Sequence, residues 1–180
     1  MYKIGDKIIH QQEGACYIKE FTQLSMENEN REYYVLEPIC DTKAKLYISK
    51  EKNHDKRIRL AISQKEMKEL ERVADSTDLD WIMDPKKRYQ SYQKTISGFD
   101  FLEVLLVLKN LTVQNAKKPL CSKDNQLFRA AQKLICSEVS IVIDKDYELV
   151  TRKVEQVLSS ETVCGGILFM LDTFYDSCTC

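Results

Sequence analysis

The segment whose residue types could most clearly bind a ligand is Asp80–Lys94, "DWIMDPKKRYQSYQK". It joins Trp81, the only tryptophan of the chain, to a group of four cations, which are Lys86, Lys87, Arg88 and Lys94. Cationic side chains bind phosphates, and an indole can wedge against bases in the minor groove of DNA. The same pattern is typical of a solvated helix face beside a tryptophan that fills the junction between two modules. The residues alone leave both interpretations open.

Signals for catalysis are weak. The only histidines, His10 and His54, fall in the N-terminal third of the chain, where a structural or solvated role is more typical than a catalytic one. The sequence contains no G-x-x-x-x-G-K-[ST], G-x-G-x-x-G, H-E-x-x-H or G-x-S-x-G motif. We therefore predict that the protein is not an enzyme and uses no organic cofactor.

Seven cysteines are scattered along the chain without a C-x-x-C motif. In a reducing compartment this pattern is typical of small buried hydrophobic residues. Cys178 and Cys180 form a C-x-C tail, but Cys164 is the only other cysteine near them in sequence. Because a soft metal usually needs more ligands than these, we expect no metal site.

Charge and hydropathy describe an ordinary soluble chain. Lys and Arg number 27 against 28 Asp and Glu, so any affinity for a polyanion must come from local clustering. The N-terminus lacks the continuous apolar core of a signal peptide, and the uncharged run Thr162–Leu171 is about half the length of a membrane span. We expect a cytoplasmic protein without a membrane partner.

The elements that must position these residues are of two kinds, strand-like segments in the N-terminal part of the chain and helix-like segments after them. Between Lys7 and Ser49, the segments KIIH, ACYIKEFTQL, EYYVLEPI and KLYIS are rich in Tyr, Ile, Val and Phe and are separated by turn chemistry. In the last of them, Leu46 and Ile48 alternate with Tyr47, the period of a strand with one solvated face. Four or five strands in about 60 residues predict a curled sheet or small β-barrel.

Helical spacing follows from residue 61 to residue 158. Ser63 and Glu66 form a capping-box pattern, and Asp84-Pro85 supplies an N-cap and a first-turn proline for a helix that Gly98 ends. Three further helices are predicted to begin at Phe101, Ser122 and Asp144. The fold class predicted is therefore α+β, with a β module in residues 1–60 and an all-α module in residues 61–158.

The order of several short motifs resembles a known family. In the β module they are Gly5-Asp6, Ile8-Ile9, Gly14-Ala15, Glu32-Tyr33-Tyr34-Val35-Leu36, Tyr47-Ile48-Ser49 and Ile58-Arg59; in the helical module they are Lys87-Arg88-Tyr89, Ser97-Gly98 and Ser137-Glu138-Val139. Together they resemble the CarD/CdnL family of bacterial transcription regulators, whose N-terminal domain is shared with the transcription-repair coupling factor. The likeness spans residues 1 to about 158. It leaves residues 159–180 as an extension of unknown role.

The resemblance implies that the two modules bind different partners. In that family a Tudor-like barrel docks onto the β subunit of RNA polymerase by augmenting a sheet edge, and the helical domain contacts promoter DNA at the upstream edge of the melting bubble. There the family's tryptophan lodges in the minor groove and helps to hold the open complex. The protein is thus expected to associate with the nucleoid through RNA polymerase and to be a monomer in solution.

Individual residues carry over from the family to this chain. The polymerase-binding positions implied by the resemblance are Leu24, Met26 and Tyr47, and the DNA-binding ones are Trp81, Lys86, Lys87, Arg88 and Lys94. Some members have arginine at two of the polymerase-facing positions, so Leu24 and Tyr47 imply a more apolar contact. Trp81 lies eight residues before Tyr89, whereas many members have fewer between the two. An extra helical turn here would move the indole by about 6 Å.

Three functions follow in order of preference. The first is a transcription regulator that tethers to the polymerase β subunit and stabilises open promoter complexes through weak minor-groove contact. The second is a polymerase-binding adaptor, also non-enzymatic, that has lost useful DNA contact. The third is a barrel that binds a small ligand or peptide unrelated to transcription.

Overall fold

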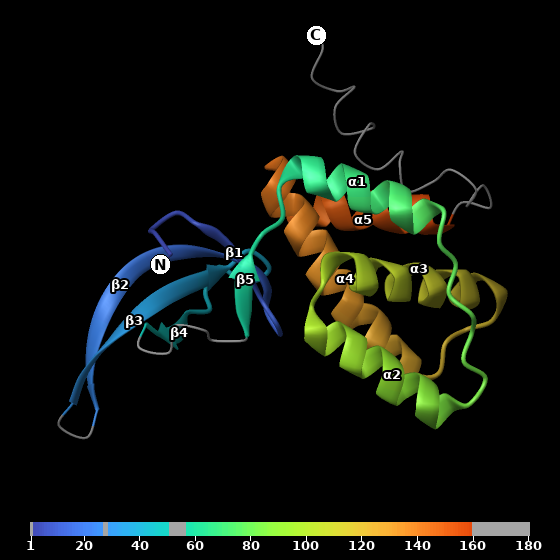
Figure 1. Ribbon diagram of the computed structural model, residues 1–180, viewed down its shortest axis with the longest axis horizontal. Coiled ribbons are helices and arrows are strands. Elements are labelled where there is room, and N and C mark those ends of the chain that lie inside the picture. Colours follow the sequence, from blue (N-terminus) through green and yellow to red (C-terminus); the bar gives the residue numbers. More distant parts are fainter. Residues whose placement is uncertain (1, 27–28, 51–56, 160–180) are drawn as a thin grey trace, which may run out of the picture.

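A computed structural model describes residues 2–26, 29–50 and 57–159 of the chain. The fold is α+β, with an antiparallel sheet at one end and a group of helices at the other (Figure 1). The strands are β1 (Lys7–His10), β2 (Gly14–Met26), β3 (Glu29–Pro38), β4 (Leu46–Ser49) and β5 (Ile58–Leu60). The helices are α1 (Gln64–Asp75), α2 (Pro85–Gly98), α3 (Phe101–Lys117), α4 (Ser122–Ile143) and α5 (Tyr147–Ser159).

The five strands form one sheet in the order β4-β3-β2-β1-β5. Within the described ranges no ladder joins β4 to β5, so the sheet is curled but open, and the closed barrel expected from the sequence is not formed. The physical reason lies in strand length: the two edge strands have four and three residues, which leaves little backbone to carry a ladder from one edge to the other. The long β2–β3 hairpin extends away from the helices instead (Figure 1).

The two faces of the sheet have different surroundings. One face holds a small core of its own, made of Ile8, Cys16, Ile18, Tyr34, Leu36, Ile48 and Ile58. On the opposite face, Ile9 and Ala15 belong to the core of the helical half. Gly14 begins β2 with φ +74°, and a Cβ there would lie 2.4 Å from the Ser137 hydroxyl oxygen, so this close approach of strand to helix requires glycine.

Local capping signals place the first two helices where the sequence predicts them. The Ser63 hydroxyl accepts a hydrogen bond from the Glu66 amide, and the Glu66 carboxylate accepts one from the Ser63 amide at 2.8 Å. Asp84 caps α2 by accepting from the amides of Lys86 and Lys87 at 2.8 and 2.9 Å. Both helix starts are thus fixed by side chains within three residues of the first turn.

The last helix begins later than predicted. Asp144 adopts a left-handed conformation with φ 56° and ends α4, whereas the Asp146 carboxylate accepts a hydrogen bond from the Leu149 amide at 3.0 Å. The first turn of α5 is therefore capped by the second of two nearby aspartates, and the predicted start at Asp144 was wrong.

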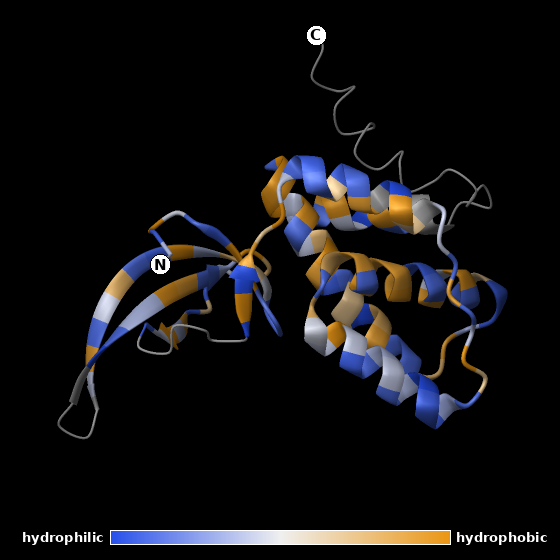
Figure 2. Ribbon diagram, in the orientation of Figure 1, coloured by the Kyte–Doolittle hydropathy of each residue, from blue (hydrophilic) through white to orange (hydrophobic). Residues whose placement is uncertain are grey.

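Helix α3 is the centre of the helical half and packs against α1, α2, α4 and α5. Its apolar residues at helical spacing are buried, among them Val104, Leu105, Leu108 and Leu111. Figure 2 shows hydrophobic residues concentrated along α3, whereas α2 carries polar residues over much of its visible surface.

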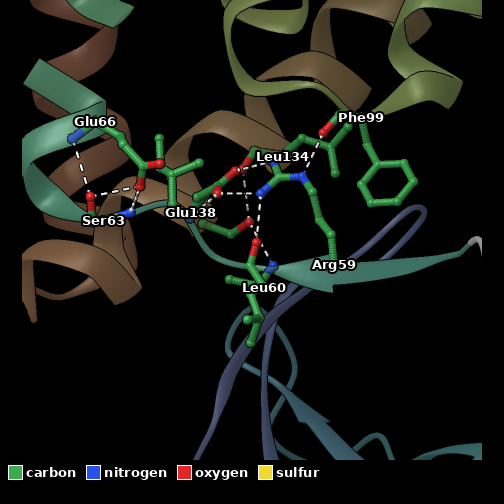
Figure 3. Close-up of polar contacts among 10 residues, drawn as sticks. Arg59, Leu60, Ser63, Glu66, Phe99, Leu134 and Glu138 are labelled. Carbon is green, nitrogen blue, oxygen red and sulfur yellow. Dashed lines mark hydrogen bonds and ion pairs between the residues drawn. The ribbon is translucent and has the colours of Figure 1, made fainter. Parts of the chain in front are cut away.

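A polar junction locks the sheet to α4. The Arg59 guanidinium of β5 forms two hydrogen bonds of 2.6 Å to the carboxylate of Glu138, which is 1% exposed (Figure 3). Arg59 Nε also donates to the Phe99 carbonyl at 2.9 Å, and the Glu138 carboxylate accepts from the Ile62 amide at 3.0 Å. Because the Ala15 amide donates to the Ser137 hydroxyl at 2.9 Å as well, sheet and helices share both a core and a hydrogen-bond network.

Candidate binding surfaces

Residues 76–84, which we call the Trp81 connector, join α1 to α2 without regular secondary structure. Trp81 is half-buried and packs against the helical core. The Arg88 guanidinium carbon lies 4.2 Å from the centre of the indole, a cation–π arrangement. Asp84 caps α2, so the residues between Trp81 and α2 lie outside the helix and add no helical turn. The indole contacts Arg88, which lies near the start of α2.

Arg88 is held by a buried ion pair. It is 5% exposed, and its Nε and Nη2 donate to the two carboxylate oxygens of Asp124 at 3.1 and 2.7 Å. Burial alone would raise the pKa of the Asp124 carboxyl, but hydrogen bonds from Arg88 and Cys121, together with the charge of Arg88, lower it below its ordinary value. Arg88, which the sequence places among the DNA-binding cations, instead packs against Trp81 and pairs with a buried carboxylate.

The three lysines of the segment are exposed on α2. Lys87 and Lys94 are seven residues apart, two helical turns, and so lie on one face of the helix. Lys86 lies about 100° around the helix axis from Lys87. We call these three residues the lysine patch. Aspartates lie next to it in sequence, since residues 78, 80 and 84 are all Asp.

Asp124 and the buried pair that it forms with Arg88 were not predicted from the sequence. Asp124 stands 36 positions from Arg88, beyond the reach of any local pattern. One signal was present: Arg88 lies four and eight residues before Tyr92 and Ile96, so a cation sits on the buried stripe of α2. A cation on such a stripe needs a buried acceptor.

The predicted polymerase-binding positions lie on β2 and on the edge strand β4. In the ladders Leu24 pairs with Arg31, and Tyr47 pairs with Val35, which in turn pairs with Glu20. Because strand neighbours in register point to the same side, these positions share the face opposite the small sheet core. We call this the outer sheet face.

Part of the outer sheet face is accessible to a partner. Tyr47 is 50% exposed and Leu24 is half-buried, whereas Val35 on the same face is buried. Met26 is placed by its strand register alone, opposite Glu29 at the end of the β2–β3 ladder. Tyr47 belongs to β4, which is an edge strand among the strands that the structure describes, and an edge is where a further strand can pair with a sheet.

The histidine and the cysteines that the structure describes have structural surroundings. His10 is buried, and its Nδ1 accepts from the amides of Gln12 and Glu13 at 3.3 and 3.2 Å in the β1–β2 turn. Cys16 and Cys136 are buried as expected, and burial raises the pKa of each thiol to about 12. Cys121 is exposed, contrary to the expectation for the cysteines.

Other expectations concern residues outside the described ranges. These are His54, Cys164, Cys178 and Cys180. Among the residues that are described, no group of three or more His, Cys, Asp or Glu side chains is arranged to hold a metal ion. None of the described helices is long and apolar enough to span a bilayer.

Two family models match the chain. Residues 2–62 match the CarD-like/TRCF RID domain, and residues 67–155 match the CarD C-terminal domain. A search of curated proteins finds no match. The two matched segments correspond to the sheet half and to the helical half up to α5.

Proposed function

Because the chain belongs to the CarD family, whose domains indicate an RNA polymerase-interacting transcription regulator, we propose that it tethers to the β subunit of RNA polymerase and stabilises open promoter complexes. The sheet half acts as a Tudor-like docking module. The helical half contacts promoter DNA at the upstream edge of the bubble. Neither role requires catalysis or a cofactor.

The observation that carries this proposal is that two candidate contact surfaces belong to one tightly joined body. The outer sheet face, with Tyr47, lies on the half that the RID domain model matches. Trp81 and the lysine patch lie on the other half, and the Arg59–Glu138 pair with the shared core connects the two. A tether that binds polymerase therefore sets the position of Trp81 relative to the DNA held by the same polymerase.

Weak DNA binding is sufficient in this arrangement. Docking on polymerase raises the effective concentration of the helical half near the promoter, so a contact too weak to bind free DNA still shifts the equilibrium in the complex. Trp81 supplies an apolar wedge, and Lys86, Lys87 and Lys94 supply phosphate contacts. Since only the melted promoter accepts the wedge, the open complex gains from it differentially.

A second function, the polymerase-binding adaptor without useful DNA contact, is favoured by two observations. Trp81 is only half-exposed because it stacks on Arg88. The aspartates at positions 78, 80 and 84 also reduce the positive potential around the lysine patch.

Photocrosslinking from position 81 in a promoter–polymerase complex separates the two functions. Crosslinks to DNA at the upstream edge of the bubble are expected if Trp81 is a wedge, and crosslinks to protein alone are expected for the adaptor. Failure of the protein to bind polymerase at all would contradict both and leave the ligand-binding sheet as the remaining function.

A further inference from the structure

Two polar side chains interrupt the apolar surface of α3. Lys109 is 5% exposed and Asn110 is 8% exposed. Burying an ammonium or an amide group is costly unless the group is hydrogen-bonded. The hydrogen-bond partners of Lys109 and Asn110 therefore indicate the role of these two buried side chains.

Lys109 binds the end of α1 and the start of the Trp81 connector. Its Nζ donates to the carbonyls of Ala74 and Thr77 at 3.0 Å each and lies 2.9 Å from the Asp78 carboxylate. Carbonyls at a helix C-terminus lack partners within the helix, and a cation there satisfies them. The hydrogen bond and the charge of Lys109 also lower the pKa of Asp78.

Asn110 binds the next part of the connector. Its Nδ2 donates a short hydrogen bond to the carbonyl of Leu79, two residues before Trp81. Its Oδ1 is buried without a hydrogen-bond partner among the described residues. An apolar residue of similar shape would avoid that unsatisfied acceptor but would leave the Leu79 carbonyl without its donor, so asparagine at this position serves the connector rather than the core around α3.

The connector is also anchored on the far side of Trp81. Arg88 Nη1 donates to the carbonyl of Ile82 at 2.7 Å, while its guanidinium stacks on the indole. Trp81 therefore lies between two carbonyls, those of Leu79 and Ile82, that are each bound by a side chain of the helical core.

Close packing does not hold the connector by itself. A cleft of about 260 Å³ separates part of it from α2 and α3, and its apolar lining includes Leu79, Ile82, Tyr92, Leu106 and Val107. Because the space behind the connector is only partly filled, the hydrogen bonds from Lys109, Asn110 and Arg88 fix its course together with the packing of Trp81 and Ile82 against the core.

We propose that Lys109 and Asn110 are positioning residues that hold the Trp81 connector in one conformation, so that the indole is presented to DNA without a prior ordering cost. The DNA part of this statement rests on the proposed function; the positioning part does not. A contact made by an ordered loop avoids the entropy loss that a mobile loop would pay on binding.

Trp81 is the only tryptophan, so its fluorescence reports on the connector directly. In the unaltered protein, time-resolved anisotropy should show tumbling of the whole molecule with little fast local motion of the indole. A dominant fast component would overturn the proposal without any variant.

In Asn110→Leu and Lys109→Met, acrylamide quenching of Trp81 should rise by about two-fold, because the connector opens locally while the core stays folded.

Thr112→Val is the matched control. Thr112 lies on the same helix, is 8% exposed, and donates to the Leu108 carbonyl of its own helix at 2.8 Å. Its replacement should leave quenching unchanged. Circular dichroism and thermal melting on the same samples confirm that each variant is folded, and Asn110→Leu should melt within about 5 °C of wild type, since it loses a single hydrogen bond. Unchanged quenching in folded Asn110→Leu and Lys109→Met would overturn the positioning role.

Open-complex lifetimes separate this inference from the proposed function. If both Trp81→Ala and Asn110→Leu shorten the lifetime, the proposed function and the positioning role are both supported. If Trp81→Ala shortens it but Asn110→Leu, with loosened fluorescence, does not, positioning for DNA contact is overturned while the proposed function survives. If Trp81→Ala has no effect on the lifetime, it is the proposed wedge that fails.

Discussion

Arg59 of β5 and Glu138 of α4 form a bidentate ion pair across the junction of the two halves, with both nitrogen–oxygen distances at 2.6 Å. Glu138 is almost fully buried and also accepts from the Ile62 amide, whereas the Arg59 side chain is 26% exposed. Both residues fall in motifs that carry the family resemblance, Ile58-Arg59 and Ser137-Glu138-Val139. In this chain the pair brings the two short, separate motifs together, because each supplies one side of the contact.

Glu138→Ala should destabilise the protein by about 3–5 kcal/mol, since removing one partner leaves a partly buried guanidinium and a backbone amide without their acceptor. Urea unfolding monitored by circular dichroism measures this. Glu148→Gln, an exposed change on α5, should stay within about 0.5 kcal/mol of wild type. Equal stability of the two variants would show that the junction does not depend on the pair.

The Arg88–Asp124 pair predicts a defined acid sensitivity. The pKa of Asp124 is lower in the folded protein than in the unfolded chain, so its stabilising contribution is complete above the unfolded value of about 3.9 and is lost as pH falls below it. Asp124→Asn should cost about 3–5 kcal/mol at neutral pH, because Arg88 stays buried without a charged partner. The difference in unfolding free energy between wild type and Asp124→Asn should therefore shrink as pH falls below about 4, toward the lower pKa of the folded protein. A difference independent of pH would contradict the depressed pKa.

Tyr47→Glu should weaken binding to RNA polymerase at least about ten-fold, or roughly 1.4 kcal/mol, because it buries a charge in a partly apolar contact at the sheet edge. Binding of the full-length protein to purified polymerase measures this. Leu149→Glu on α5 is the matched control, since Leu149 is also an exposed hydrophobic residue, at 39% exposure, but lies far along the chain from the sheet. If both variants bind as wild type does, the outer sheet face is not the docking surface.

Local structure was largely predictable from the sequence, and contacts between distant residues were not. The first four strands followed from segments rich in Tyr, Ile, Val and Phe that are separated by turn chemistry, whereas β5 was not located. The first two helix starts followed from Ser63 with Glu66 and from Asp84 with Pro85, because capping is decided within one turn. The start of α5 was misplaced because Asp144 and Asp146 are both plausible caps, and only the left-handed closure of α4 decides between them.

Side-chain pairs across the fold account for the remaining differences. Arg59 and Glu138 are 79 residues apart, and no local pattern encodes such a pairing. Arg88 was grouped with Lys86 and Lys87 because the three are adjacent in sequence, yet adjacent residues on a helix point about 100° apart, and Arg88 points to the core. Sheet closure depends on how the two edge strands meet, which strand propensity does not determine.

The lysine patch predicts a shallow salt dependence for binding to free duplex DNA. Each phosphate contact contributes a slope of about −0.9 in a plot of log affinity against log salt, so three lysines give at most about −3. Lys86→Gln, Lys87→Gln and Lys94→Gln combined should bring the slope close to zero. Lys65→Gln, an exposed lysine on α1, should leave it unchanged. A steep slope that survives the triple replacement would place the DNA contact elsewhere on the protein.

Trp81→Ala distinguishes a wedge from a structural plug. Trp81 is half-buried, and its ring gains a cation–π contact with Arg88 at 4.2 Å, so its removal should cost about 1–2 kcal/mol of folding stability. A fully buried plug would cost about 3–5 kcal/mol. If the indole also wedges into melted promoter DNA, the open complex of the variant should lose about 1–3 kcal/mol of stability in addition, by analogy with aromatic side chains that stack on bases.

Melting temperature, polymerase affinity and open-complex lifetime of Trp81→Ala should be measured on one preparation. The wedge predicts a lifetime shortened by about ten-fold at saturating, fully folded protein with polymerase affinity unchanged. A large fall in melting temperature, with a normal lifetime once folded protein is saturating, would assign Trp81 to the stability of the connector and favour the adaptor function.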